Sequence, residues 1–122
     1  MSNPVNEFNA YRSKMNEKLL EDNNKIIRRM FNLDTNAYRE GVLSKKTKEL
    51  LGLGNSLVLR CDDCVKYHLE ECFKLKLSKE EVVEAMSISL LIGGTIVIPH
   101  LRRAFEYWED LEATEDEQSI LG

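Results

Sequence analysis

One helical repeat of apolar and reactive side chains, between positions 61 and 72, constrains the fold of this chain more than any other feature. The repeat has the spacing i, i+3, i+4, i+7, i+8 and i+11, and its members are Cys61, Cys64, Val65, His68, Leu69 and Cys72. This spacing lines one face of an α-helix and excludes a strand, in which one face takes every second residue. It predicts a helix that begins near Cys61 and buries this face in a core. The side chains expected to face outward are Asp62, Asp63, Lys66 and Glu70.

The N-terminal third of the chain predicts one long helix followed by less regular structure. Asn3 and Pro4 match an N-cap and a first helical position, so a helix is expected from there to about Leu20. Two asparagines then interrupt the pattern. A short helical piece is expected at 26–31, and the segment 32–41 is expected to be a loop that ends at a glycine.

Two serines predict the starts of later helices. Ser44 can cap a helix over 45–59, and Ser78 forms a capping box with Glu81 that begins another helix. In the first of these helices, one apolar stripe is expected, with the members Thr47, Leu50, Leu51, Gly54, Leu57 and Val58. The second helix is expected to run through Ala85, Ile88 and Ile92.

The C-terminal part of the chain completes an all-α pattern. Gly93 and Gly94 permit a bend or a close helix crossing, and Pro99 starts or kinks a last helix. That helix carries Leu101, Phe105 and Trp108, and the acidic tail 112–122 is expected to fray. No strand-like alternation extends over a useful length. We therefore predict one all-α domain, 1–122, with five or six helices, a size that can bury a real core.

Charge and hydropathy argue against a nucleic-acid partner and against a membrane. The net charge is −4, and the basic residues form isolated pairs rather than a cluster. The first residues lack a signal-peptide pattern, and the longest apolar stretch, 85–99, is shorter than the ~18–20 residues that a membrane span needs. We expect a cytoplasmic protein, in which a close cysteine pair is catalytic or metal-binding rather than structural.

Four side chains around the expected helix form a chemical set. Cys61 and Cys64 are three residues apart, so their Cα atoms would lie about 5–6 Å apart, which a disulfide accepts. In the first helical turn, free N–H groups would stabilise a Cys61 thiolate. His68 is one turn beyond Cys64 and could take its proton. If the chain folds back near Arg60, Glu49 comes close enough to orient and polarise the imidazole.

Zinc is the main alternative for this stretch, because the pattern C-x2-C-x3-H-x3-C supplies suitable ligand atoms. In a helix with a rise of ~1.5 Å per residue, Cys61 lies about 10 Å from His68 and about 16 Å from Cys72 along the axis. Tetrahedral zinc needs bonds of about 2.3 Å to sulfur. A helix therefore excludes one shared ion, and we expect neither a metal nor another cofactor. The side chains expected to serve packing or surface roles are Cys72, Tyr67, His100 and Tyr107.

The spacing E-x11-C-x2-C-x3-H, from Glu49 through Cys61 and Cys64 to His68, resembles a known family signature. It is similar to that of the AhpD-like (alkylhydroperoxidase D) branch of the carboxymuconolactone decarboxylase family. The resemblance covers about 43–107, so the first forty residues would be a helical extension and the acidic tail lies outside it.

The resemblance implies an all-α fold that forms homo-oligomers, commonly trimers or hexamers. It also implies reduction of peroxides through the cysteine pair, with an external dithiol as reductant. Carried over by motif position, Cys64 would be the peroxidatic cysteine and Cys61 the resolving one. His68 would be the base, and Glu49 its polarising partner in a proton relay.

Two departures from the family pattern affect this interpretation. The family often has Ala and Gly four and eight residues after the motif histidine, where this chain has Cys72 and Lys76. Cys72 is a third thiol that could enter the disulfide chemistry. The decarboxylases that give the family its name lack the cysteine pair, which argues against decarboxylation here.

The leading hypothesis is a thiol-dependent peroxidase or disulfide reductase. The alternatives left open are a non-enzymatic redox-sensing or scaffold oligomer, a carboxymuconolactone decarboxylase-type enzyme, and a zinc-binding helical module.

Overall fold

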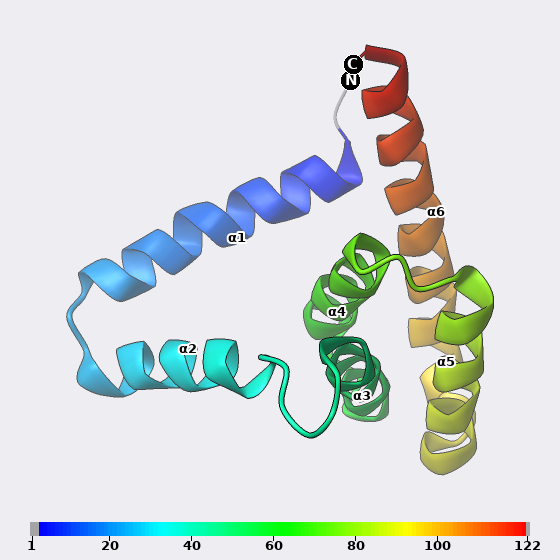
Figure 1. The fold of residues 1–122 in the computed structure, drawn as a ribbon, viewed down its shortest axis with the longest axis horizontal. Coiled ribbons are helices and arrows are strands. Elements are labelled where there is room, and N and C mark those ends of the chain that lie inside the picture. The colour runs from blue at the N-terminus through cyan, green and yellow to red at the C-terminus, as the bar shows by residue number, and fades with distance from the viewer. Residues whose placement is uncertain (1–2, 122) are drawn as a thin grey trace.

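Six α-helices and one 3-10 helix make up the part of the chain that the structure describes. A computed structural model describes residues 3–121, with side chains through residue 118, and no strand occurs within that range. The elements are α1 (Pro4–Glu21), α2 (Lys25–Ala37), α3 (Lys45–Val58), α4 (Asp62–Lys74), α5 (Lys79–Gly93), the 3-10 helix η1 (Thr95–Val97) and α6 (Ile98–Leu121) (Figure 1). The predicted all-α fold class is confirmed.

Helices α3 to α6 form the body of the molecule (Figure 1). Helix α3 packs against α4 and α5, and α6 packs against α4. The core between these helices includes Leu53, Leu57, Val65, Leu69, Cys72, Met86, Val97 and Trp108. Each of the described helices is too short or too polar to cross a lipid bilayer.

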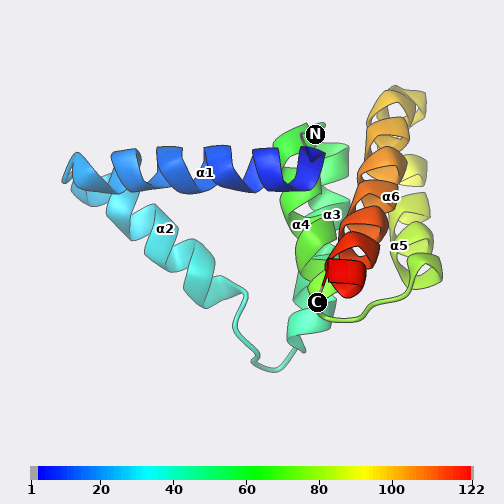
Figure 2. The ribbon, with the colours of Figure 1, turned by 90° about the horizontal axis from the view of Figure 1, so that it is seen from above.

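Helices α1 and α2 form an arm, residues 4–37, that projects from the body as a V (Figure 2). The start of the arm is held by Asn3, whose Nδ2 donates to Oγ1 of the buried Thr114 at 3.0 Å. Its far end is held by Lys48 of α3, whose Nζ donates to the carbonyl oxygens of Ala37 at 2.8 Å and Arg39 at 2.7 Å. The arm is therefore tied to the body at both ends, while none of the residues of α2 is buried.

The capping signals predicted the helix starts correctly. The loop expected at 32–41 was wrong for residues 32–37, which are helical. Asn24 caps α2, and the helix then continues to Ala37 because no glycine or proline interrupts it. Ser44 and Ser78 cap their helices as predicted, and the capping box of Ser78 with Glu81 is present.

The C-terminal segment is more ordered than expected at its end. Helix α5 ends at Gly93, and Gly94 takes a φ of +84°, a value that favours glycine and allows the chain to turn into η1. Helix α6 does not fray at the acidic tail but continues to Leu121. The contact between Thr114 and the start of α1 gives this stretch a partner that the sequence pattern did not indicate.

The buried faces of α3 and α4 also differ from the expected ones. The buried residues of α3 are Glu49, Gly52, Leu53, Ser56 and Leu57, and only Leu57 belongs to the predicted stripe. In α4, Glu70 was expected to face outward but is buried under the arm, where Asn9 Nδ2 donates to its Oε1 at 2.7 Å.

The predicted apolar stripe of α3 instead borders a surface groove, together with apolar residues of α5. This apolar groove has a volume of about 310 Å³. Its lining residues are Thr47, Leu50, Leu51, Gly54, Asn55, Val58, Ala85, Ile88, Ser89 and Ile92. Ile88 and Ile92, which lie on the predicted helix, remain 56% and 70% exposed along this groove.

Candidate functional site

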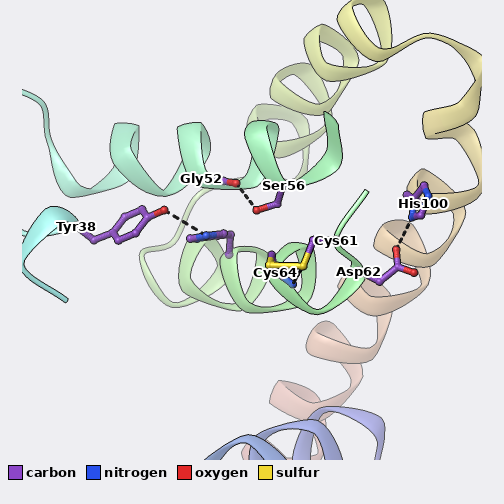
Figure 3. The surroundings of a disulfide bond; sticks show 8 residues. Tyr38, Gly52, Ser56, Cys61, Asp62, Cys64 and His100 are labelled. Carbon is purple, nitrogen blue, oxygen red and sulfur yellow. Dashed lines mark hydrogen bonds and ion pairs between the residues drawn. A yellow bond between two sulfur atoms is a disulfide. The ribbon is translucent and has the colours of Figure 1, made fainter. Parts of the chain in front are cut away.

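The two motif cysteines lie together at the start of α4 (Figure 3). Cys61 and Cys64 form a disulfide, with their Cα atoms 5.3 Å apart. Cys61 is the N-cap of α4, one position earlier than predicted, and the backbone N–H of Cys64 donates to its Sγ at 3.3 Å. Arg60, with a φ of +60°, makes the turn from α3 that places the pair there. The predicted disulfide spacing is thus realised at a helix terminus.

The two cysteines are more accessible than the helical repeat suggested. Cys64 is exposed and Cys61 is half-buried, whereas both were expected on the buried face. The repeat placed Cys64 correctly along the helix, but its side chain lies at the solvent edge of the stripe. A sulfur atom at this edge can meet a substrate or a reductant without any opening of the core.

Glu49 and His68 form the buried half of the site. The chain turns back near Arg60, so that α3 and α4 pack together and Glu49 Oε1 lies 2.8 Å from His68 Nδ1. Glu49 is 0% exposed and His68 is 7% exposed. The proximity predicted from the fold-back of the two helices is therefore present in the structure.

The buried carboxylate has a partner for each oxygen. Oε1 accepts from His68, and Oε2 lies 3.4 Å from the ammonium of Lys45, one turn earlier on α3. An unpaired buried carboxylate would be strongly unfavourable, so these two partners are what allow Glu49 to stay inside. Because the carboxylate accepts a hydrogen bond from the N–H group at Nδ1, neutral His68 keeps its lone pair on Nε2. This nitrogen is the one that can accept a proton.

Tyr38 approaches that nitrogen, and sequence reasoning missed it. Its hydroxyl oxygen lies 3.3 Å from His68 Nε2, and the two ring centroids are 5.1 Å apart. Figure 3 labels Tyr38 and draws this contact as a dashed line. Tyr38 is the C-cap of α2 and falls in the segment that was expected to be a loop. No spacing rule connects it to the motif, because the contact depends on how the arm returns to the body.

Gly52 makes room for this contact. A Cβ atom at this position would lie 2.6 Å from His68 Cε1 and 2.8 Å from the Tyr38 hydroxyl oxygen. Both distances are too short for a real Cβ, so a side chain here would displace the imidazole or the phenol. A glycine inside the apolar pattern of a helix is a signal for such close approach, and it could have been used.

A pocket of about 450 Å³ opens beside His68. Its lining residues are Ala37, Tyr38, Leu43, Lys48, Leu51, Gly52, Asn55, Ser56, Leu59 and His68. Most of these side chains are apolar or small, and they come from α2, α3, α4 and the loop before α3. The pocket gives access to the imidazole from the side on which the arm joins the body.

Cys72 and His100 lie outside the reactive set. Cys72 is a free, fully buried thiol, and burial, aided by Glu49 and Glu71, raises its pKa to about 12. His100 Nδ1 lies 2.7 Å from Asp62 Oδ1, which ties the first turn of α4 to α6 (Figure 3). Both side chains occupy the packing or surface roles that were predicted.

Tyr67 and Tyr107 also pack as predicted. Tyr67 meets His68 edge-on with its ring centroid 5.1 Å away, and Tyr107 is buried against Phe8. Burial raises the pKa of Tyr67 to about 12, so its hydroxyl stays protonated at neutral pH.

Metal-binding geometry is absent from the part of the chain that the structure describes. Within residues 3–121, no group of three or more His, Cys, Asp or Glu side chains is arranged to hold an ion. The helix at 62–74 spaces the candidate ligands along its axis.

Comparisons with known proteins agree with this fold and this motif. The sequence profile of the carboxymuconolactone decarboxylase family matches residues 25–107, more than half of the chain. The chain belongs to the carboxymuconolactone decarboxylase family. Its cysteine, histidine and glutamate spacing agrees with the AhpD-like branch of this family.

Solved structures of family members extend the similarity to nearly the whole chain. One crystal structure of a Thermotoga maritima protein matches this chain with a TM-score of 0.88 and 50% sequence identity. The match covers 91% of this chain and 97% of the Thermotoga chain. A second structure of that protein describes it as a family member with a suggested part in the antioxidative response. A Legionella pneumophila family member, 23% identical with a TM-score of 0.81, covers 90% of this chain and 98% of its own and shares the fold.

One curated relative is less similar in sequence, and its name states no activity. An uncharacterized protein of Cupriavidus necator is 27% identical over 77 residues, which are 63% of this chain and 68% of that protein.

The first prediction concerns the space at Gly52. Gly52→Ala should displace His68 or Tyr38 and lower the free energy of unfolding by roughly 1–3 kcal/mol, because a buried methyl group must be accommodated. Urea denaturation measures this change. The matched control is Gly54→Ala on the same helix, where the new Cβ would lie 3.2 Å from Ser89 Oγ and a small shift suffices. Equal stability of the two variants would contradict the proposed crowding.

The second prediction concerns thiol reactivity. A chromogenic disulfide reagent should detect no thiol in the native oxidised protein, because Cys61 and Cys64 are bonded and Cys72 is buried with a pKa of about 12. After reduction, the native protein should expose the Cys61 and Cys64 thiols only. Unfolding of the reduced protein should also make Cys72, the last of the 3 cysteines, react with the reagent. Rapid labelling of Cys72 in the native protein would show that this part of the core opens readily.

Proposed function

We propose that the protein is a thiol-dependent peroxidase of the AhpD-like type. The observation that carries the proposal is the pairing of an exposed, disulfide-forming Cys64 with the buried Glu49–His68 contact one turn away. The dithiol form of the Cys61–Cys64 pair supplies two electrons as it closes to the disulfide, and a buried imidazole with an oriented lone pair supplies a base. The suggested antioxidative part of the Thermotoga maritima relative, which is 48% identical in that structure, supports the same activity.

The proposed reaction begins at Cys64. His68 accepts the thiol proton, and the thiolate attacks one oxygen of the peroxide. The O–O bond breaks, an alcohol or water leaves with a proton, and Cys64 becomes a sulfenic acid. The thiol of Cys61 then attacks the sulfenic sulfur, which releases water and forms the disulfide. An external dithiol restores both thiols by exchange and becomes a disulfide itself.

The surroundings of the two cysteines support the roles that we propose for them. Cys64 is exposed and lies one turn from His68, which suits a residue that meets the peroxide. Cys61 is half-buried at the N-cap and already in bonding distance, which suits a residue that resolves the sulfenic acid. A reducing compartment such as the cytoplasm, which we propose as the location, would supply the dithiol donor.

The third prediction tests Cys64 directly. Cys64→Ser should reduce peroxide consumption to background in an assay coupled to a panel of dithiol donors, because no sulfenic acid can form. Cys61→Ser should allow one oxidation of Cys64, which a sulfenic-acid reagent would trap, but no sustained turnover.

The matched control for this test is Cys72→Ala, which should retain turnover because that thiol is buried and outside the site. If Cys64→Ser kept most of its activity, the assignment would be wrong. A wild-type protein that cycles its disulfide without consuming any peroxide would instead favour a redox sensor.

We also propose that the protein assembles as a homo-oligomer, with a trimer or hexamer as the expected size. The support is apolar surface on two separate elements. On α2, Ile26, Met30 and Leu33 are each more than 60% exposed, and the α3–α5 groove carries Ile88 and Ile92. Contiguous exposed apolar surface of this kind is typical of interfaces between proteins.

The fourth prediction tests this assembly. Light scattering during size-exclusion chromatography should give a mass several times the 14.1 kDa of one chain. Ile88→Glu should lower that mass, because a charge would have to be buried at the interface. Ser87→Glu adds the same charge at an exposed neighbouring position outside the groove and should leave the mass unchanged. A monomeric wild-type protein would refute the proposal.

A further inference from the structure

We infer that Tyr38 is a positioning residue for His68: its hydroxyl group bonds to Nε2 in both protonation states of the imidazole and so stabilises the imidazolium that forms when Cys64 loses its proton. This inference rests on the proposed function. Tyr38 lies outside the sequence motif, on a different helix from the other members of the site, and touches His68 rather than the reacting sulfur.

The first step of the argument is the orientation of the imidazole. The Glu49 carboxylate accepts from Nδ1 at 2.8 Å, so the free lone pair of the neutral ring is on Nε2. The only hydrogen-bond partner of Nε2 among the described side chains is the Tyr38 hydroxyl, at 3.3 Å. In the neutral state the phenol therefore donates and the imidazole accepts.

The second step is what changes when His68 gains a proton. Nε2 then becomes a donor, and it needs an acceptor because the ring is almost entirely buried. A hydroxyl group is both donor and acceptor, so Tyr38 can rotate its O–H bond and accept from the imidazolium. A hydrogen bond to a charged group is stronger than a neutral one, so the charged state gains more from Tyr38 than the neutral state does.

The third step is that the surroundings keep Tyr38 in place and protonated. Lys48 holds the last turn of α2 by bonding to the carbonyl oxygens of Ala37 and Arg39, on either side of Tyr38. Gly52 leaves just enough room for the phenol and the imidazole to meet. Burial, with contributions from Asp34 and Glu49, raises the pKa of Tyr38, so its proton is available to Nε2.

Several charged groups lie in this region and also affect the protonation equilibrium of His68. Those around the two tyrosines that contact His68 are Glu49, Lys45 and Lys48 from α3, Asp34 from α2, Glu71 from α4 and Arg12 from α1. The Arg12 guanidinium lies 4.5 Å from the Tyr67 ring centroid. The substitution of Tyr38 by Phe changes none of these charges. A change in His68 behaviour in that variant can therefore be attributed to the lost hydroxyl.

The fifth prediction is the effect of Tyr38→Phe, measured in two ways that need no peroxide. In ¹⁵N NMR spectra of the oxidised protein, the Nε2 resonance of neutral His68 should move downfield, as expected for a lone pair that has lost its donor. In the reduced protein, the pH profile of Cys64 alkylation by iodoacetamide should shift to higher pH, because the imidazolium is less stable. The alkylation rate at neutral pH should fall about 10-fold.

Two further variants separate this role from simple packing. Tyr67→Phe is the matched control, since Tyr67 also packs on His68 but makes no hydrogen bond to it, and both measurements should stay unchanged. Lys48→Gln loosens the anchor of Tyr38 without touching His68 and should shift both measurements in the same direction by a smaller amount. Unchanged readouts in Tyr38→Phe, or equal shifts in Tyr67→Phe, would overturn the inference. Because neither readout depends on turnover, a failure of the peroxidase proposal would be seen separately in the peroxide assay.

Discussion

The contact between Glu49 and His68 is the interaction on which the rest of the site depends. A carboxylate that is fully buried on α3 must find partners for its charge, and it finds the imidazole of α4 and the ammonium of Lys45. This requirement fixes how α3 and α4 face each other after the turn at Arg60. It also explains why the face of α3 that enters the body carries Gly52 rather than a larger side chain, because the imidazole occupies the space where a Cβ would lie.

The local parts of this site could be predicted from the sequence, because they depend on helical spacing. Residues three apart on a helix are neighbours, so the pairing of Cys61 with Cys64 needed no tertiary information. Glu49 required one further assumption, a fold-back between two predicted helices, and the structure contains it. Tyr38 could not be found in this way, since its contact with His68 spans 30 residues and depends on the path of the arm.

The burial of whole helix faces was harder to predict, for a physical reason. Helices α3 and α5 each have apolar side chains on more than one face, and hydrophobic periodicity alone does not distinguish a face that packs in the core from one that packs against another chain. Leu51, Ile88 and Ile92 follow the expected spacing yet remain exposed. The buried face of α3 contains Glu49 and Ser56, which a search for apolar stripes would pass over.

The proposed division of the site into an exposed cysteine and a buried base has a consequence for assembly. In the proposed mechanism Cys64 reacts at the surface, whereas His68 keeps the stabilising contact with Tyr38 only while the end of α2 stays docked beside it. The arm holds this position through few contacts, since none of the residues of α2 is buried in the single chain. In the proposed oligomer, a second copy that covered Ile26, Met30 and Leu33 would restrict the motion of α2 and hold Tyr38 against the imidazole. Assembly and proton transfer would then be coupled through one helix, without any residue of the second copy entering the site.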